Sequence, residues 1–175
     1  MKRVPLIVSA LMLPLLATAG LLIWRTPAVS AQGTSTANML VVTAVTRKCF
    51  VQTAPLDFGQ YDPVQANATA ALDAQNNMTV ACTKGTVVTI GIDNGANATG
   101  EVRRMAGGAS SFLAYELYQD AGRTLRWGNV AGQLFDAGVA PSRDPRTFVI
   151  YGRVPGAQDV TEGTFQDTVV VTVNF

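Results

Sequence analysis

The residues with the most reactive side chains in this 175-residue chain are two cysteines, Cys49 and Cys82, and no histidine accompanies them. Without histidine, the sequence lacks the Ser-His-Asp and Cys-His nucleophile arrangements and the side chain that most often binds transition metals. The 12 acidic residues are scattered, and several stand in turn contexts such as Asp62-Pro63, where aspartate bonds to its own backbone. We therefore predict a protein that is not an enzyme, with no catalytic residues, no metal site and no cofactor.

The first 31 residues have the order of an export signal. Lys2 and Arg3 give a positive start, and the stretch from Val4 to Ile23 is almost unbroken apolar sequence. A small-residue cleavage pattern ends at Ala31, so we expect cleavage between Ala31 and Gln32. Residues 1–31 are thus predicted to be a signal peptide that is removed on export.

Two alternatives to this cleavage remain open. A weaker small-residue pattern occurs at Ala17-Thr18-Ala19, and an apolar stretch of this length also suits an uncleaved membrane anchor.

With cleavage after Ala31, 175 − 31 leaves 144 residues, enough for one domain with its own core. The removed part holds three of the 13 basic residues, so 10 − 12 gives the rest a formal charge of −2. Such a balance favours neither nucleic acid nor an anionic membrane as a partner.

Cys49 and Cys82 are predicted to form a disulfide. An exported chain enters an oxidising compartment, where a single pair of cysteines is normally bridged. The bridge would close a loop of about 33 residues, which is worth about 3 to 4 kcal/mol of stability if it acts by restricting the unfolded chain. Two free thiols are the less favoured reading.

The rest of the chain indicates an all-β domain, a sandwich or a barrel. Short runs rich in β-branched residues alternate with Gly, Pro and Asn, and no segment after Ala31 has helical periodicity. Paired strands are expected about the turns at Lys84-Gly85 and Asp120-Ala121-Gly122, whereas residues 132–145 and the pair Arg103-Arg104 are expected in loops. The expected strands are Met39–Thr46, Cys49–Thr53, Asn77–Cys82, Thr86–Asp93, Phe112–Gln119, Thr124–Trp127, Thr147–Val154 and Thr164–Phe175.

Two of these strands alternate clearly. In the last one, Val169, Val171, Val173 and Phe175 share one face, as expected of a half-buried strand. Near the start, one face of an extended segment presents Ala37, Met39, Val41, Thr43 and Val45.

Eight short motifs, in order, resemble the spore coat protein U domain family, the subunit family of archaic chaperone-usher pili. The resemblance runs over nearly the whole chain after Ala31, and the order of the motifs makes it specific although each alone is weak. The motifs are Cys49, Leu56–Asp62, Thr79–Gly85, Arg103–Met105, Leu113–Asp120, Arg126–Gly128, Val149–Pro155 and Gly163–Val169.

The resemblance implies an immunoglobulin-like β-sandwich that lacks its final strand and is completed by a strand from another chain. A periplasmic chaperone would fill the groove first, and an outer-membrane usher would then exchange it for the N-terminal extension of the next subunit. We expect that extension in residues 32–46, overlapping the first strand of a domain that spans residues 39–175. The alternating residues from Ala37 to Val45 are the donor-strand candidates, and those from Val169 to Phe175 are candidates for the border of the groove.

The function implied by the resemblance is structural. We expect an exported subunit of a pilus or surface appendage that polymerises by donor-strand exchange with other copies or related subunits and supports adhesion and biofilm formation. A spore or cyst coat protein of the same family, and a surface- or carbohydrate-binding adhesin module, remain alternatives. The aromatic residues, among them Phe58, Tyr115 and Trp127, are predicted to lie in the core rather than on a binding surface.

Overall fold

The structure is a computed structural model that describes residues 32–175, so the predicted signal segment 1–31 and Ala31 of its cleavage site lie outside the described residues. The described chain divides into two units, residues 32–42 and a compact domain of residues 43–175. Residues 32–42 form neither helix nor strand, and their side chains are exposed. Between residues 32 and 175, no helix is long and apolar enough to cross a membrane.

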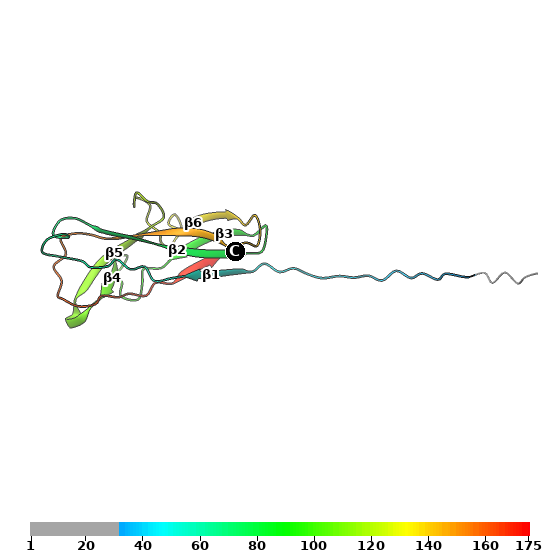
Figure 1. The fold of residues 1–175 in the computed structure, drawn as a ribbon, viewed down its shortest axis with the longest axis horizontal. Coiled ribbons are helices and arrows are strands. Elements are labelled where there is room, and N and C mark those ends of the chain that lie inside the picture. The colour runs from blue at the N-terminus through cyan, green and yellow to red at the C-terminus, as the bar shows by residue number, and fades with distance from the viewer. Residues whose placement is uncertain (1–31) are drawn as a thin grey trace, which may run out of the picture. The chain divides into compact units, whose positions relative to one another are not determined.

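The domain is built from strands, with a single 3₁₀ turn at Gly108–Ser110 and no α-helix among its described residues. Figure 1 shows the start of β1 and the C-terminus at the same end of this domain. The strands are β1 (Cys49–Thr53), β2 (Leu72–Cys82), β3 (Val87–Ile92), β4 (Arg103–Ala106), β5 (Phe112–Tyr118), β6 (Phe135–Val139), β7 (Arg146–Val154) and β8 (Val171–Asn174).

Two sheets form a sandwich. The first has the order β1-β2-β7-β5-β4, and the second has the order β6-β3-β8. Each pairing between neighbouring strands is antiparallel. The prediction of an all-β, immunoglobulin-like sandwich is confirmed. β1 and β8 each have one paired neighbour, so each is an edge strand of its sheet.

The core lies between the two sheets. Alternate residues of β2 and β5 point inward, including Met78, Val80 and Leu117, and they meet Val88 and Ile90 of β3. Trp127 is fully buried and its indole N–H donates to the carbonyl of Ile90, 2.9 Å away. The aromatic residues named above are core residues or pack against the core, as predicted.

The predicted disulfide is confirmed. Cys49 and Cys82 are bonded and face each other directly in the register of β1 and β2. The bond lies where β1 begins, so it fixes the point at which the N-terminal segment enters the sandwich.

One predicted strand is wrong: Met39–Thr46 forms no strand, and the first strand begins at Cys49. A pattern of β-branched residues indicates that the backbone tends to be extended, but an extended segment becomes a strand only when a neighbouring strand forms hydrogen bonds with it. Within the described chain, no strand pairs with residues 39–46. The compact unit of the domain is Thr43–Phe175, and the domain boundary at Met39 stays a prediction.

Other local expectations are corrected by the sheet topology. Lys84-Gly85 is a turn, but it connects β2 in one sheet to β3 in the other, so the two strands do not form a hairpin. Residues 124–127 do not form a strand: they contact β5 through an isolated bridge between Tyr118 and Arg126 and through the ion pair of Arg126 with Glu116. The last strand is shorter than expected, because regular pairing with β3 begins at Val171. β6 lies within the stretch 132–145, which was expected to be irregular.

The largest correction concerns Arg103, which was expected on an exposed loop. It belongs to β4 and is 0% exposed. Its guanidinium donates to the carbonyl oxygens of Ile92 at 2.8 Å, of Trp127 at 2.7 Å and of Asp93, and it forms an ion pair with Glu116. Burial lowers the pKa of Arg103, and the adjacent Glu116 carboxylate opposes that shift. Arg103 therefore ties the first sheet to the end of β3 in the second.

Replacing this buried arginine should destabilise the domain far more than replacing its neighbour. We expect Arg103→Met to cost about 3 to 5 kcal/mol of unfolding free energy, because it leaves buried carbonyls without their donor and removes one of the two arginines that pair with Glu116. Arg104→Met is the matched control, since Arg104 is half-buried and makes a hydrogen bond to the carbonyl of Asn97 and a stack on Phe112. Urea unfolding of both variants measures the difference, and equal losses would contradict the role given to Arg103.

Candidate functional site

The candidate site is an apolar cleft between two irregular segments of the domain. One segment follows β1 and covers residues 54–63, and the other precedes β8 and covers residues 160–170. We call them the first wall and the second wall. Two cavities of about 530 and about 540 Å³ lie between the walls. Four side chains, those of Leu56, Phe58, Met105 and Phe165, line both cavities, and we call the two neighbouring cavities together the cleft.

The floor of the cleft is the inner face of the sandwich. It is formed by side chains of β3, β4, β5 and β7 that belong to the core or pack directly against it. These floor residues are Ile92, Met105, Leu113, Tyr115, Leu117, Ile150 and Val154. An object that fills the cleft would therefore extend the hydrophobic core.

The second wall has a free main-chain edge. Gln166 exchanges hydrogen bonds with Ala106 of β4, and Thr168 and Val170 bond to the segment that follows β3. These alternate residues all bond on the same side. Because main-chain groups alternate in direction along an extended chain, those of Asp167 and Val169 point the other way. Within the described residues they have no hydrogen-bond partner.

The first wall is similar. Leu56 and Phe58 line the cleft, and their main-chain N–H and C=O groups have no partner in the described part of the chain. This wall is held from behind instead. The side-chain amide of Asn76 donates to the carbonyls of Ala54 and Pro55, and the Tyr61 hydroxyl donates to the carbonyl of Pro155 at 3.1 Å.

Asp167 holds the second wall in place. Its carboxylate accepts hydrogen bonds from the Tyr115 hydroxyl at 2.8 Å and from the main-chain and side-chain nitrogens of Asn97 at 3.1 and 2.9 Å. Burial raises the pKa of Tyr115, and the bond to Asp167 adds to that effect, so the phenol stays a neutral donor. Gly95 has a φ of +87°, and a Cβ there would lie 2.0 Å from Asp167 Oδ2, so the carboxylate needs this glycine.

Two of the four candidates for the border of the groove line this cleft, and their role as a border stays a prediction. Val169 and Val171 line it, and both pack against the core together with Val173. Phe175 instead has 55% of its surface exposed. The alternation of the last strand thus agrees with the structure up to Val173.

The donor-strand candidates occupy a different part of the chain. Ala37, Met39, Val41, Thr43 and Val45 are exposed, as is Gln32, the described residue of the predicted cleavage site. Met39, Val41 and Val45 expose 84, 78 and 82% of their surface, which is unusual for large apolar residues so close together in the chain. Their role as a donor strand stays a prediction.

Sequence reasoning missed the residues that hold the walls. Asp167 lies in the motif Gly163–Val169 of the family resemblance, but that motif gives it no role, and Asn76 lies outside all eight motifs. Leu56 and Phe58 lie in a motif of the family resemblance, which was the available signal for the first wall. Nothing in the local sequence indicated that these residues from distant segments meet around one cleft.

Comparisons with known proteins agree with the fold. Residues 35–172 match the family model of the Spore Coat Protein U domain. Protein U of Myxococcus xanthus is 34% identical over 158 residues, which cover 81% of this chain and 86% of that protein.

Among solved structures, a chain of the CsuC–CsuE chaperone-tip adhesion subunit pre-assembly complex from the archaic chaperone-usher Csu pili of Acinetobacter baumannii superposes with a TM-score of 0.57. It is 21% identical, and the match covers 75% of this chain but only 40% of that one, so the likeness concerns the fold. An antigen and type I fimbria protein of Burkholderia pseudomallei matches with a TM-score of 0.42 and 14% identity, over 74% of this chain and 99% of its own.

Removing the Asp167 carboxylate should loosen the second wall. We expect Asp167→Ala to lower the unfolding free energy by about 1 to 3 kcal/mol, because Tyr115 and Asn97 lose their acceptor. The hydrogen-bonded amides of Gln166 and Val170 should then exchange faster with deuterium. Asp144→Ala is the control, since the Asp144 carboxylate is exposed and bonds to Ser142. Unchanged exchange in Asp167→Ala would show that the wall is held by other contacts.

Proposed function

Because the chain belongs to the Spore Coat Protein U domain family, we propose that it is an exported structural subunit that polymerises by donor-strand exchange. Residues 1–31 direct export and are removed, and residues 32–46 then serve as the donor strand. This segment of one copy fills the cleft of the next copy. The product is a pilus-type fibre on the cell surface that supports adhesion and biofilm formation.

The main support for this proposal is the free main chain on both walls of the cleft. Main-chain N–H and C=O groups without partners, next to an exposed apolar floor, form an unfavourable surface because their hydrogen bonds are not made by protein. A small ligand could not make a whole row of these hydrogen bonds. An added strand satisfies them all and places alternate side chains into the floor. Asp167 and Val169 of the second wall supply such groups next to β8, which has no second neighbour.

The N-terminal segment has the properties that this cleft requires. It has exposed apolar residues at alternate positions, and it forms no ladder within the described chain. The 11 residues from Phe165 to Phe175 span about 33 Å when extended, whereas the 15 residues from Gln32 to Thr46 reach about 50 Å. Because Met39–Thr46 is not a strand of its own domain, we infer that the segment can act as a donor up to about Val45, beyond which the Thr46 carbonyl accepts a hydrogen bond from the Thr83 hydroxyl.

Two partners follow from the proposal. Before polymerisation the cleft needs temporary cover, which a periplasmic chaperone would provide with a strand of its own. An outer-membrane usher would then exchange that strand for the extension of the next subunit. The solved chaperone-subunit complex that shares this fold supports such a partner.

A spore or cyst coat is the second candidate, and the name of the matched family favours it. A coat and a fibre would use the same cleft and the same donor strand. They would differ in the place where the polymer forms, whereas the mechanism of polymerisation would be the same. Electron microscopy of cells that produce the chain would distinguish thin surface fibres from a continuous layer.

Deleting residues 32–42 tests the donor strand. We expect the shortened chain to be exported in normal amounts but to form no ladder of heat-dissociable oligomers on gels, because the cleft receives no strand. Oligomer ladders as abundant as those of the full chain would refute the proposal.

Two point variants in the full chain locate the inserted face. Val41 and Val42 expose 78 and 77% of their surface, so they form a matched pair on opposite faces of the extended segment. Val41→Asp should reduce oligomer formation at least about 100-fold, because it places an unpaired charge in the apolar cleft at a cost of about 3 kcal/mol or more. Val42→Asp should have much less effect. Equal behaviour of the two variants would contradict insertion of the face that carries Val41.

A further inference from the structure

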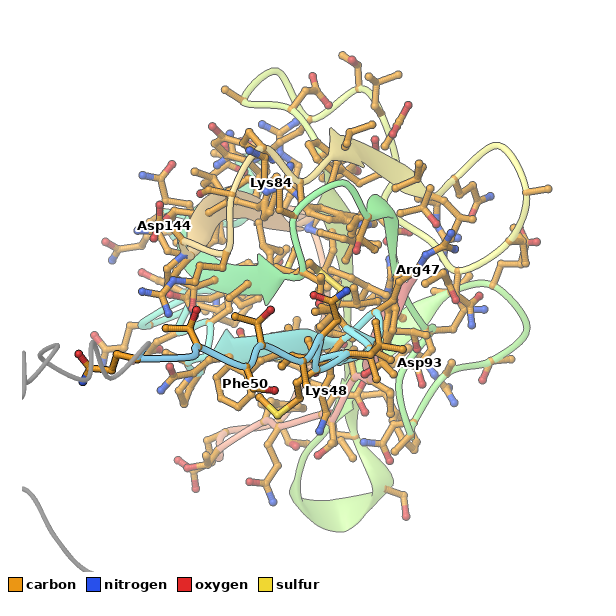
Figure 2. All side chains as sticks on the ribbon, turned by 90° about the vertical axis from the view of Figure 1, so that its right-hand side faces the viewer. Arg47, Lys48, Phe50, Lys84, Asp93 and Asp144 are labelled. Carbon is orange, nitrogen blue, oxygen red and sulfur yellow. A yellow bond between two sulfur atoms is a disulfide. The ribbon has the colours of Figure 1, made fainter. Side chains whose placement is uncertain are left out.

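One end of the domain carries exposed positive charge, and we call it the basic end. Arg47, Lys48 and Lys84 are exposed there, and none of them forms an ion pair within the described residues. They lie together because Thr83 N–H donates to the carbonyl of Lys48, at the point where β1 begins and β2 ends. Figure 2, which looks at this end, labels all three side chains together with those of Asp93 and Asp144, so the positive charge there is in excess but is not the only charge in view.

The opposite end carries exposed negative charge, and we call it the acidic end. Asp57, Asp159 and Glu162 are exposed there and also lack ion pairs in the described chain. Asp57 and Glu162 line the cleft itself. No lysine or arginine occurs in residues 54–72 or 154–175. Three arginines lie nearby. Arg153 and Arg123 share the Asp73 carboxylate, at 2.7 and 3.3 Å, and Arg104 stacks on Phe112 of β5.

The position of the donor segment determines which ends meet. Residue 46 lies at the basic end, where its carbonyl accepts a bond from the Thr83 hydroxyl. β8 runs from the acidic end to the basic end, because Asn174 pairs with Thr89 near the start of β3. A donor strand antiparallel to β8 runs from the basic end of the acceptor to its acidic end. Residue 46 of the donor, which connects the strand to its own domain, therefore leaves the cleft at the acidic end of the acceptor. The basic end of the donor subunit then faces that acidic end, whereas a parallel strand would bring two basic ends together.

The length of the segment excludes antiparallel insertion into its own cleft. The segment would first have to cross the domain from the basic end to the acidic end and then return, a path of about 66 Å if each crossing spans about 33 Å. The 15 residues from Gln32 to Thr46 reach only about 50 Å. An antiparallel donor must therefore come from a second copy.

We propose that the basic end of one subunit docks against the acidic end of the next, and that this charge pairing sets the direction of the donor strand. The inference rests on the proposed function and adds to it a second contact outside the cleft. Arg47 and Lys48 of the donor copy lie nearest to the emerging strand, and Asp159 and Glu162 of the acceptor copy lie at its exit. Like charges at two basic ends would oppose the parallel arrangement.

Exposed ion pairs contribute little to final stability, about 0 to 1 kcal/mol each. Their main effect is on the rate at which two subunits associate. Complementary charged surfaces raise association rates about 10-fold to 1,000-fold when salt does not screen the charges. The Debye length is about 30 Å at 0.01 M salt and about 3 Å at 1 M. The charge pairing should therefore appear in the rate of assembly at low salt.

Charge reversal in the full exported chain tests this contact, with the rate of oligomer ladder formation as the readout. We expect Arg47→Glu with Lys48→Glu to slow assembly about 10-fold or more at about 0.01 M salt, and Asp159→Lys with Glu162→Lys to do the same. All four changes together should restore the rate to within about 3-fold of the original, because complementarity returns. At about 1 M salt the differences should largely disappear.

The controls separate this contact from simpler effects. Arg47→Lys with Lys48→Arg keeps the charge and should assemble at the original rate. The first reversal changes the charge of residues 32–175 from −2 to −6, and the second changes it from −2 to +2. Repulsion by net charge alone would thus slow only the first variant.

The outcomes distinguish the two proposals. Slowing in only one reversed variant, or no rescue in the fourfold variant, would overturn the charge pairing while polymers still form. Reversed variants that assemble at the original rate would overturn it as well. An unaltered chain that forms no oligomers would overturn the donor-strand proposal, and the charge pairing with it.

Discussion

The unpaired edge beside β8 is the constraint on which the rest of this structure depends. A polar main chain can border an apolar interior only if its hydrogen bonds are made, and here Asp167 and Val169 make none within the described chain. The same segment places Val169 and Val171 against the core. The segment therefore has packed core on one side and main-chain groups without a partner, within the described chain, on the other.

Several independent contacts keep the cleft in shape. Arg103 ties β4 to the end of β3, and Asp167 holds the second wall against Tyr115 and Asn97. The disulfide anchors β1, from which the first wall continues. These are polar or covalent contacts with defined directions, so they do not depend on the cleft being filled. A cleft that exists before its occupant arrives requires little rearrangement for strand addition.

The sequence predicted those features that depend on local pattern. The alternation from Val169 to Val173 and the pairing of the two cysteines could be deduced from residue types and spacing. Arg103 was misplaced because a basic pair is normally solvated, and only the tertiary fold supplies the buried carbonyls that it binds. Met39–Thr46 was predicted to be a strand because an extended segment has the same pattern whether its partner lies in its own chain or in another. The cleft is built from segments about 100 residues apart, so no local pattern predicts it.

Hydrogen exchange at the second wall tests the central claim most directly. The chain lacking residues 32–42 can be compared with and without a synthetic peptide of residues 32–46, following the amides of Asp167 and Val169. These amides are unpaired in the structure, so they should exchange rapidly alone and become strongly protected once the peptide adds a strand beside them. Rapid exchange that persists with the peptide bound, or protection confined to the β4 or β6 edge, would contradict the account.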